Sequence, residues 1–227
     1  MAFGAIWGNR VNVVRGALGV LTTCAALCLA QAAAPAKNVL EEELDINTIK
    51  LMAKHGQLIH LSYSGEEISY RMVAMLADAP PDAAWEAVSD VERYHEFVPE
   101  MLPVKVLSRG KDELTVEHTV QVKVIAMVKA TEKYSTRYVF KKPRLYMHSP
   151  DDPKAEPGYW ELVPVDGGKK TLLIYFDKAP DLSKMGSMVK LVIKAKPEFG
   201  LALQVSPVSI LIKAMKSRAE EIAVGKK

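Results

Sequence analysis

The sequence predicts an α+β domain in which a curved antiparallel sheet wraps round a long C-terminal helix, with two short helices after the first strand. Three observations lead to this prediction. Residues Leu114 to Val124 alternate apolar and polar side chains, which is the pattern of a strand with one buried face and one wet face. Apolar residues between Val208 and Ile222 recur at helical spacing. The stretch from Ala79 to Pro103 contains two short helical segments bounded by prolines.

The N-terminal 32 residues have the pattern of a secretory signal peptide. Arg10 and Arg15 supply the positive charge, the run from Gly16 to Ala30 is apolar and uncharged, and Ala30-Gln31-Ala32 fits a small-x-small cleavage site. The apolar run is shorter than the ~20 residues that a membrane-spanning helix needs. We therefore expect export to the periplasm with cleavage near Ala32, and retention as a membrane anchor is the alternative.

Composition excludes several classes of function. Both cysteines, Cys24 and Cys28, lie in the predicted signal peptide, so the mature chain would have no disulfide, no thiolate nucleophile and no cysteine metal site. The formal net charge is +3, and removal of Arg10 and Arg15 would bring the mature chain still closer to neutral. Such a balance argues against nucleic-acid binding, which needs concentrated positive charge.

Residues 33–64 are predicted to form an N-terminal extension that packs on the domain of residues 65–227. Acidic residues precede a short apolar-rich helix that begins near Ile46, and Gly56 is well placed to end it. A strand is expected from Leu58 to Tyr63.

Within the domain, apolar alternation and turn residues predict a series of strands. Arg109-Gly110-Lys111-Asp112 and Asp166-Gly167-Gly168 are predicted hairpin turns. The pattern becomes apolar on both faces near Ile125 to Val128, where we expect a bulge, a turn or a covered end. The expected strands are Ile68–Ala77, Val104–Ser108, Leu114–Val128, Thr131–Phe140, Arg144–His148, Tyr159–Val163 and Thr171–Phe176.

Helical periodicity begins near Leu182. A first amphipathic segment carries Met185 and Met188 on its apolar stripe, and Pro197 and Gly200 interrupt it. Ser206 is then predicted to cap a new helix with Pro207 at its first position. We expect this second helix to be held by the sheet and the first segment to act as a lid.

The residues from Ala79 to Met101, APPDAAWEAVSDVERYHEFVPEM, resemble the signature of the polyketide-cyclase and coenzyme-Q-binding branch of the START-like (SRPBCC, helix-grip) superfamily. That pattern is an apolar strand, a proline turn, a helix with a central Trp (Trp85), then Asp90, an aromatic residue and Phe-Val-Pro. The resemblance covers about Gly65 to the C-terminus. It implies a sheet curled round the C-terminal helix, with a hydrophobic cavity between them. Most members of the superfamily bind lipids or other apolar molecules without chemistry, and some are cyclases.

The sequence contains no strong catalytic motif, and its five histidines do not have metal-ligand spacing. We therefore predict neither a metal nor a cofactor. His118 is the one ionisable residue on an apolar strand face, where it could bind a ligand hydroxyl, act as a general base or be a satisfied core histidine. The core role is the preferred interpretation. The residues predicted to line the cavity are Trp85, Tyr94, Phe97, Met101, His118, Val120, Val122, Tyr134, Trp160, Tyr175, Met188, Val192, Leu211 and Met215.

Lys190 and Lys194 flank the apolar stripe of the lid-like segment and could rest on an anionic membrane. A solvated helix face is the simpler interpretation of the same pattern.

The function that fits best is non-catalytic binding and transport of a lipid, a sterol-like compound or a quinone by an exported monomer. No nucleic-acid partner is expected. The first alternative is a polyketide cyclase or aromatase with His118, Tyr134 or Tyr175 as acid or base. The second is a protein-interaction module of the same fold. Export argues against both alternatives.

Overall fold

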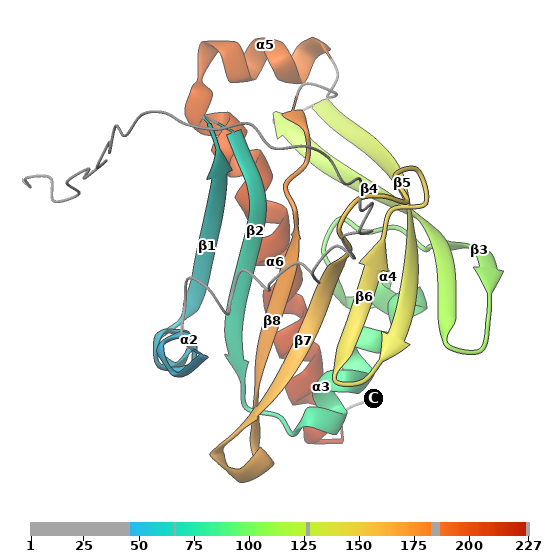
Figure 1. Cartoon of the computed structure of the whole chain (residues 1–227). Helices are drawn as coiled ribbons and strands as arrows, with labels where there is room; N and C mark the ends of the chain where they lie inside the picture. The colour runs from blue at the N-terminus through green and yellow to red at the C-terminus, as the bar shows by residue number, and fades with distance from the viewer. Residues whose placement is uncertain (1–45, 66, 126–127, 183–186, 226–227) are drawn as a thin grey trace, which may run out of the picture. The chain divides into compact units, whose positions relative to one another are not determined.

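The structure is a computed structural model that describes residues 46–65, 67–125, 128–182 and 187–225. Its centre is one antiparallel sheet of eight strands in the order β1-β2-β8-β7-β6-β5-β4-β3 (Figure 1). The predicted α+β helix-grip architecture is confirmed, since this sheet packs on one long C-terminal helix. The strands are β1 (Gln57–Ser64), β2 (Glu67–Ala77), β3 (Lys105–Arg109), β4 (Glu113–Ile125), β5 (Val128–Lys141), β6 (Arg144–His148), β7 (Gly158–Val165) and β8 (Lys170–Lys178).

Two short helices follow β2, as predicted, and two more helices end the chain. Pro81 occupies the first turn of α3, where its missing N–H removes no helical hydrogen bond. The sequence also suggests Asp90 as the cap of the second short helix, but its side chain makes no capping hydrogen bond and its backbone N–H bonds the Glu86 carbonyl. The helical elements are α2 (Ile46–Lys54), α3 (Pro81–Ser89), the 3-10 turns η1 (Val91–Arg93) and η2 (Asp166–Gly168), α4 (Tyr94–Phe97), α5 (Ser187–Ala195) and α6 (Pro197–Ala223).

The expected strand from Leu114 to Val128 is too long. β4 ends at Ile125 and β5 begins at Val128, so the stretch that is apolar on both faces is the connection of a long hairpin. The loss of alternation near Ile125 to Val128 therefore marks the end of β4, and the expected strand runs three residues past it.

The predicted helix start at Ser206 is also wrong, because α6 runs without interruption from Pro197 through Pro207 to Ala223. Gly200 lies inside the helix, where a Cβ atom would come within 3.2 Å of a Leu182 methyl group and 3.4 Å of Ile193 on α5. Gly200 therefore allows α5 to pack closely on α6 rather than ending a helix. By length and composition, residues Glu198–Ala223 could cross a membrane.

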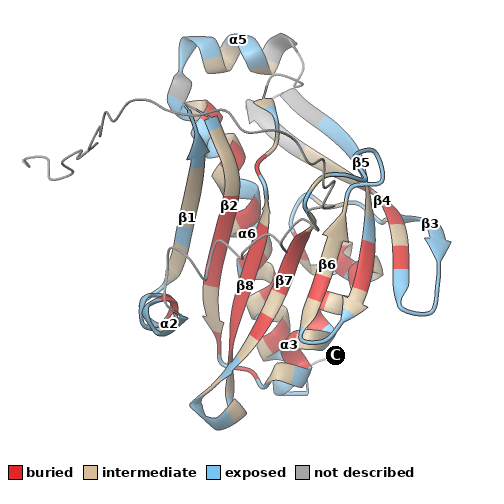
Figure 2. Cartoon of the chain, in the orientation of Figure 1, coloured by how far each residue is buried: buried red, intermediate tan, exposed pale blue. Residues whose placement is uncertain are grey.

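The sheet carries a hydrophobic cluster on each face. Figure 2 shows that β2, β8 and β7 in the middle of the sheet contain many of the buried residues. On the inner face, Val208, Ile212, Met215 and Ala219 of α6 are buried with residues of the sheet and α3. On the outer face, Ile49 and Ala53 of α2 belong to a smaller cluster. Two-sided burial explains why β8 is buried over the six consecutive residues Thr171–Phe176 instead of alternating.

Candidate functional site

The space between the inner face of the sheet and α6 is called the interior, and its two ends differ in chemistry. At the α3 end, Val73, Leu162, Leu173, Ile212 and Met215 are all buried. They belong to one cluster of apolar side chains, so this end is a packed core.

At the α5 end, a buried ion pair joins the sheet to α6. Arg71 of β2 and Asp177 of β8 face each other across the strand pair, and Arg71 Nε lies 2.7 Å from an Asp177 carboxylate oxygen. Arg71 also donates to the backbone carbonyl of Gln204 on α6. The Tyr175 hydroxyl donates to Asp177 at 3.0 Å, and the Gln204 side chain donates to the Pro180 carbonyl at 3.2 Å. The bonds to Asp177 and to the Gln204 carbonyl satisfy the buried Arg71 guanidinium, whose burial would otherwise be costly.

His118 lies on the same inner face, in β4, and is completely buried. Its Nε2 atom is 2.8 Å from the hydroxyl oxygen of Tyr138 on β5. Burial lowers the pKa of His118 to about 4, so the imidazole is neutral near pH 7.

Tyr134 marks the point where the α5 end of the interior meets solvent. It pairs with His118 in the β4–β5 register, so both rings are on the inner face, where they stack with centroids 5.1 Å apart. Although it faces inward, Tyr134 is 46% exposed, whereas His118 is fully buried. Desolvation by surrounding protein nevertheless raises the pKa of Tyr134 to about 12. This exposed part of the inner face is called the Tyr134 opening.

Gly158 lies where the sheet is tightly packed near Asp177. It begins β7 opposite Met147, and an added Cβ atom would lie 2.8 Å from the Phe176 carbonyl oxygen and 3.2 Å from the Asp177 Cβ atom. A side chain at this position would displace its neighbours, so glycine allows the close approach of β7 and β8 here.

The structure brings the predicted cavity residues together around the interior, but in different environments. His118, Val120, Tyr134, Trp160 and Tyr175 share the inner sheet face. The residues that are buried in or packed against the inner cluster are Trp85, Tyr94, Phe97, Met101, Trp160, Tyr175, Leu211 and Met215.

The remaining predicted residues lie near the α5 end or cannot be placed. Val192 is half-buried on α5, and Lys190 and Lys194 are exposed there. The side chains of Val122 and Met188 lie outside the described part of the chain. Whether this set lines a ligand cavity stays a prediction.

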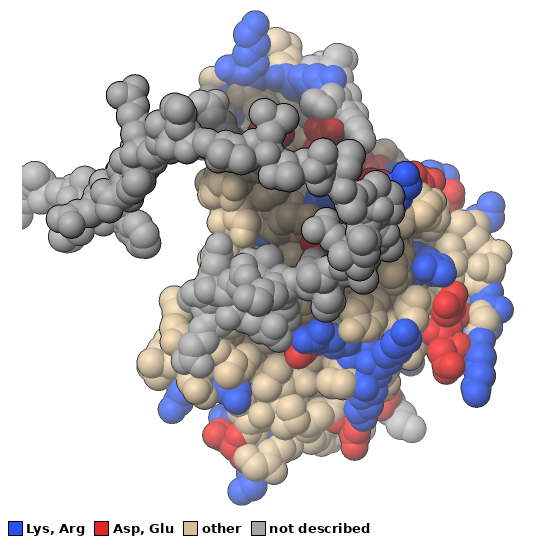
Figure 3. All heavy atoms as spheres, viewed as in Figure 1, with Lys and Arg blue, Asp and Glu red and all other residues tan. Residues whose placement is uncertain are grey.

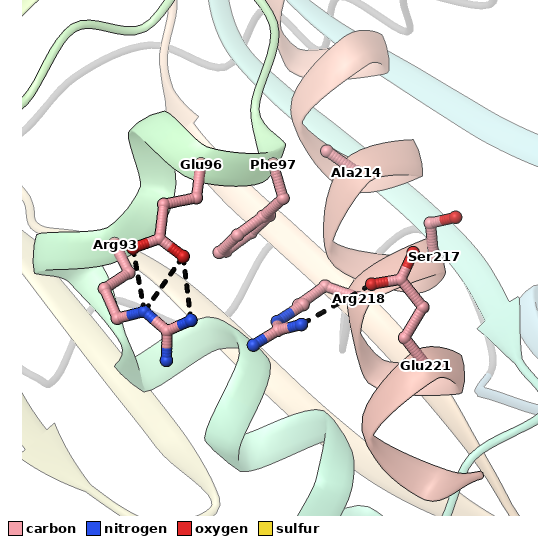
Figure 4. A pocket seen from close by; sticks show the side chains of 7 residues that line it. All are labelled: Arg93, Glu96, Phe97, Ala214, Ser217, Arg218 and Glu221. Carbon is pink, nitrogen blue, oxygen red and sulfur yellow. Dashed lines mark hydrogen bonds and ion pairs between the residues drawn. The ribbon is translucent and has the colours of Figure 1, made fainter. Parts of the chain in front are cut away.

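A separate hollow of about 360 Å³ lies between α4 and the last turns of α6 (Figure 4). The ring of Phe97 forms one wall, and the Arg218 guanidinium lies 5.7 Å from its centre. Arg93 pairs with Glu96, and Arg218 lies 3.5 Å from Glu221, so the charged groups of this hollow neutralise one another. The hollow is polar and differs from the apolar cavity that the sequence predicts.

Sequence reasoning missed the part of the site made by Arg71, Asp177 and Gln204. In the sequence, Arg71 alternates with the apolar residues Tyr70 and Met72 of its strand, so it is expected on the opposite face. Only the strand register shows that this face is buried. Within residues 46–225, apart from the segments that are not described, no group of three or more His, Cys, Asp or Glu residues is arranged to hold a metal ion.

A family model described as "Polyketide cyclase / dehydrase and lipid transport" matches residues 77–221. The chain belongs to this family. The match begins at the last residue of β2 and ends in the final turn of α6, so it includes both ends of the interior. No curated protein matches the chain significantly.

Solved structures agree with the family at the level of fold. A STAR-related lipid transfer protein from Xanthomonas axonopodis aligns with a TM-score of 0.52 and 13% identity, covering 72% of this chain and 93% of its own. The Zhui aromatase/cyclase from Streptomyces sp. R1128 has a TM-score of 0.48 and 15% identity, and the alignment covers 70% of this chain and 98% of the cyclase. Human STARD10 has a TM-score of 0.46 and 12% identity, and the alignment covers 78% of this chain and 80% of STARD10. At these identities the likeness concerns the fold alone.

Proposed function

We propose that the protein binds an apolar molecule, such as a lipid, a sterol-like compound or a quinone, at the α5 end of the interior and carries it without chemical change. The observation that supports this most directly is the Tyr134 opening, where an inward-facing aromatic ring remains 46% exposed. At ~0.8 kcal/mol per buried CH₂ group, a sixteen-carbon chain gains about 12 kcal/mol on leaving water. A modest apolar space can therefore hold such a ligand firmly.

Native mass spectrometry of protein purified without detergent, followed by solvent extraction, tests this proposal. The expected result is a co-purifying lipid, sterol or quinone at close to one molecule per chain. A protein that is free of ligand and also takes up no fluorescent lipid would contradict the proposal.

A cyclase is the second candidate, and the His118–Tyr138 hydrogen bond favours it. A neutral imidazole beside a phenol has the geometry of a general base, and the pKa of about 4 keeps it unprotonated at neutral pH but also makes it a weak base. Turnover of a polyketide-like substrate that is lost in His118→Phe would favour the enzyme. Ligand binding without turnover in either form would favour the carrier.

We also propose that α5 contacts an anionic membrane during loading or release. Lys190 and Lys194 are exposed on α5, and Leu191 between them is 63% exposed (Figure 3 shows basic side chains at the top of the view, over α5). In the described parts of the chain, no carboxylate forms an ion pair with either lysine. An apolar residue between unpaired lysines suits the headgroup region of an anionic bilayer.

Co-sedimentation with vesicles tests the membrane contact. Lys190→Gln/Lys194→Gln should weaken binding to phosphatidylglycerol vesicles and change little with pure phosphatidylcholine. Lys111→Gln/Lys169→Gln removes the same charge from two hairpin turns and is the matched control. Equal binding by both double variants would exclude docking through α5.

Residues 1–32 lie outside the described part of the chain, and we propose that they direct export and are removed. The expected mature N-terminus in a periplasmic fraction is Ala33. Recovery of the full-length chain in the membrane fraction would instead indicate an anchor.

A further inference from the structure

The Nδ1 atom of His118 is a buried polar atom without a partner. Among the described residues it has no hydrogen bond, although the whole side chain is 0% exposed. Folded proteins rarely leave such an atom unpaired, and an exception needs an explanation, such as a bound group. The other ring nitrogen, Nε2, is already engaged by the Tyr138 hydroxyl.

The hydrogen bond between His118 and Tyr138 indicates which nitrogen of His118 carries the proton. A phenol is more acidic than a neutral imidazole, so the expected donor in this pair is the Tyr138 hydroxyl and the acceptor is Nε2. A neutral His118 that accepts at Nε2 consequently carries its own proton on Nδ1.

Tyr134 is the neighbour of His118 that contacts solvent. Its ring stacks on the His118 ring at 5.1 Å with an angle of 30° between the planes, and it is itself 46% exposed. Its hydroxyl makes no hydrogen bond to any described residue. Rotation of the Tyr134 side chain therefore breaks no such bond and would uncover the His118 ring.

We propose that a ligand oxygen accepts a hydrogen bond from His118 Nδ1–H when Tyr134 turns aside, so that the site selects apolar molecules with a carbonyl group, such as ketones, quinones or esters. This inference rests on the proposed function, because it assigns the ligand class of the same site. It does not require catalysis, since the imidazole serves as a donor and keeps its proton. A hydrocarbon of the same shape would leave the N–H group unpaired and would bind more weakly.

Two matched fluorescent probes test the selectivity. One is dodecanoyl-dimethylaminonaphthalene, whose ketone joins the ring to the chain, and the other is its dodecyl analogue, in which CH₂ replaces the carbonyl. The full-length chain should bind the ketone about tenfold more tightly, which corresponds to about 1.4 kcal/mol. The ketone's emission should also move to longer wavelength than in an aprotic solvent, because its carbonyl accepts a hydrogen bond.

His118→Phe keeps a flat ring but removes the N–H group. It should bind both probes equally, with the affinity of wild type for the dodecyl probe. His148→Phe is the matched control, because His148 is half-buried on the outer sheet face and its loss should leave the tenfold preference intact. Equal affinities in wild type, or a preference that survives in His118→Phe, would overturn the inference while leaving the carrier function in place. If neither probe binds wild type, the proposed function fails as well.

Nuclear magnetic resonance of wild type gives a test that needs no variant. Long-range ¹H–¹⁵N spectra distinguish protonated from unprotonated ring nitrogens. We expect the proton of His118 on Nδ1. A proton on Nε2 would contradict the proposed donor role whatever the probes show.

Discussion

The two ends of the interior hold α6 against the sheet by different interactions. At the α3 end, α6 is held by apolar side chains such as Ile212 and Met215, which are 0% exposed. At the α5 end, the same helix is held through a backbone carbonyl by Arg71, and Leu201 on its surface is 46% exposed. A cavity-forming fold needs both arrangements. A dense core supplies stability, while directional polar bonds hold a region that must leave space for a ligand.

The strongest test of this comparison is loss of the ion pair. Arg71→Leu would leave the Asp177 carboxylate mostly buried without its partner, which should cost about 3–5 kcal/mol of unfolding free energy in urea denaturation. Arg71→Leu/Asp177→Leu removes both charges and should recover most of that loss. If the single variant is as stable as wild type, polar bonds do not hold the α5 end.

Truncation at each end of α6 should have unequal effects. Met215→Ala opens a cavity in the packed core and should cost about 2–5 kcal/mol, whereas Leu201→Ala on the exposed half should change stability by less than about 0.5 kcal/mol. Both losses are measured by urea unfolding at constant pH. Similar costs for the two variants would mean that the two ends are packed alike.

The smallest expected effect is a dependence of the unfolding free energy on pH. The pKa of His118 is about 4 in the folded protein and near 6.5 in an unfolded chain, so the unfolded state binds the proton first as the pH falls. The associated stability is complete above the unfolded value and declines as acid is added, by about 2 kcal/mol between pH 7 and pH 5.

His118→Phe should lack this part of the pH dependence, and His148→Phe controls for the loss of any histidine. The measurement is the difference between variant and wild type in unfolding free energy at the two pH values. A difference that does not change with pH would show that His118 is not desolvated in the folded state.

Sequence reasoning predicted the fold because its signals are local. Alternation from Leu114 onwards placed His118 on the same strand face as Val116 and Val120, and this face is the inner one in the structure. The helix pair after β2 was visible from its prolines and aromatic residues. These patterns depend on neighbours within a few positions, which a single sequence displays directly.

The polar half of the site could not be predicted because its partners are distant in the chain. Arg71 and Asp177 are separated by 106 positions, and only the β2–β8 register brings them together.

The error in the predicted helix start at Ser206 has a different cause. Ser-Pro is a good local helix start, but packing on both sides of Pro207 keeps the helix continuous, so tertiary contacts override the local preference.

Burial of β8 on both faces has a consequence before the chain folds. Thr171–Phe176 reads TLLIYF, a short stretch of strand-forming, uncharged residues without proline, which is the composition that assembles into cross-β fibrils when exposed. Lys170 on one side and Asp177-Lys178 on the other are charged gatekeepers that oppose such stacking. In the native sheet the segment pairs with β2 and β7, so neither of its edges is free to recruit another chain. A chain that crosses a membrane unfolded would expose this hexapeptide until β2 and β7 pair with it. Rapid pairing of these two strands would therefore limit aggregation.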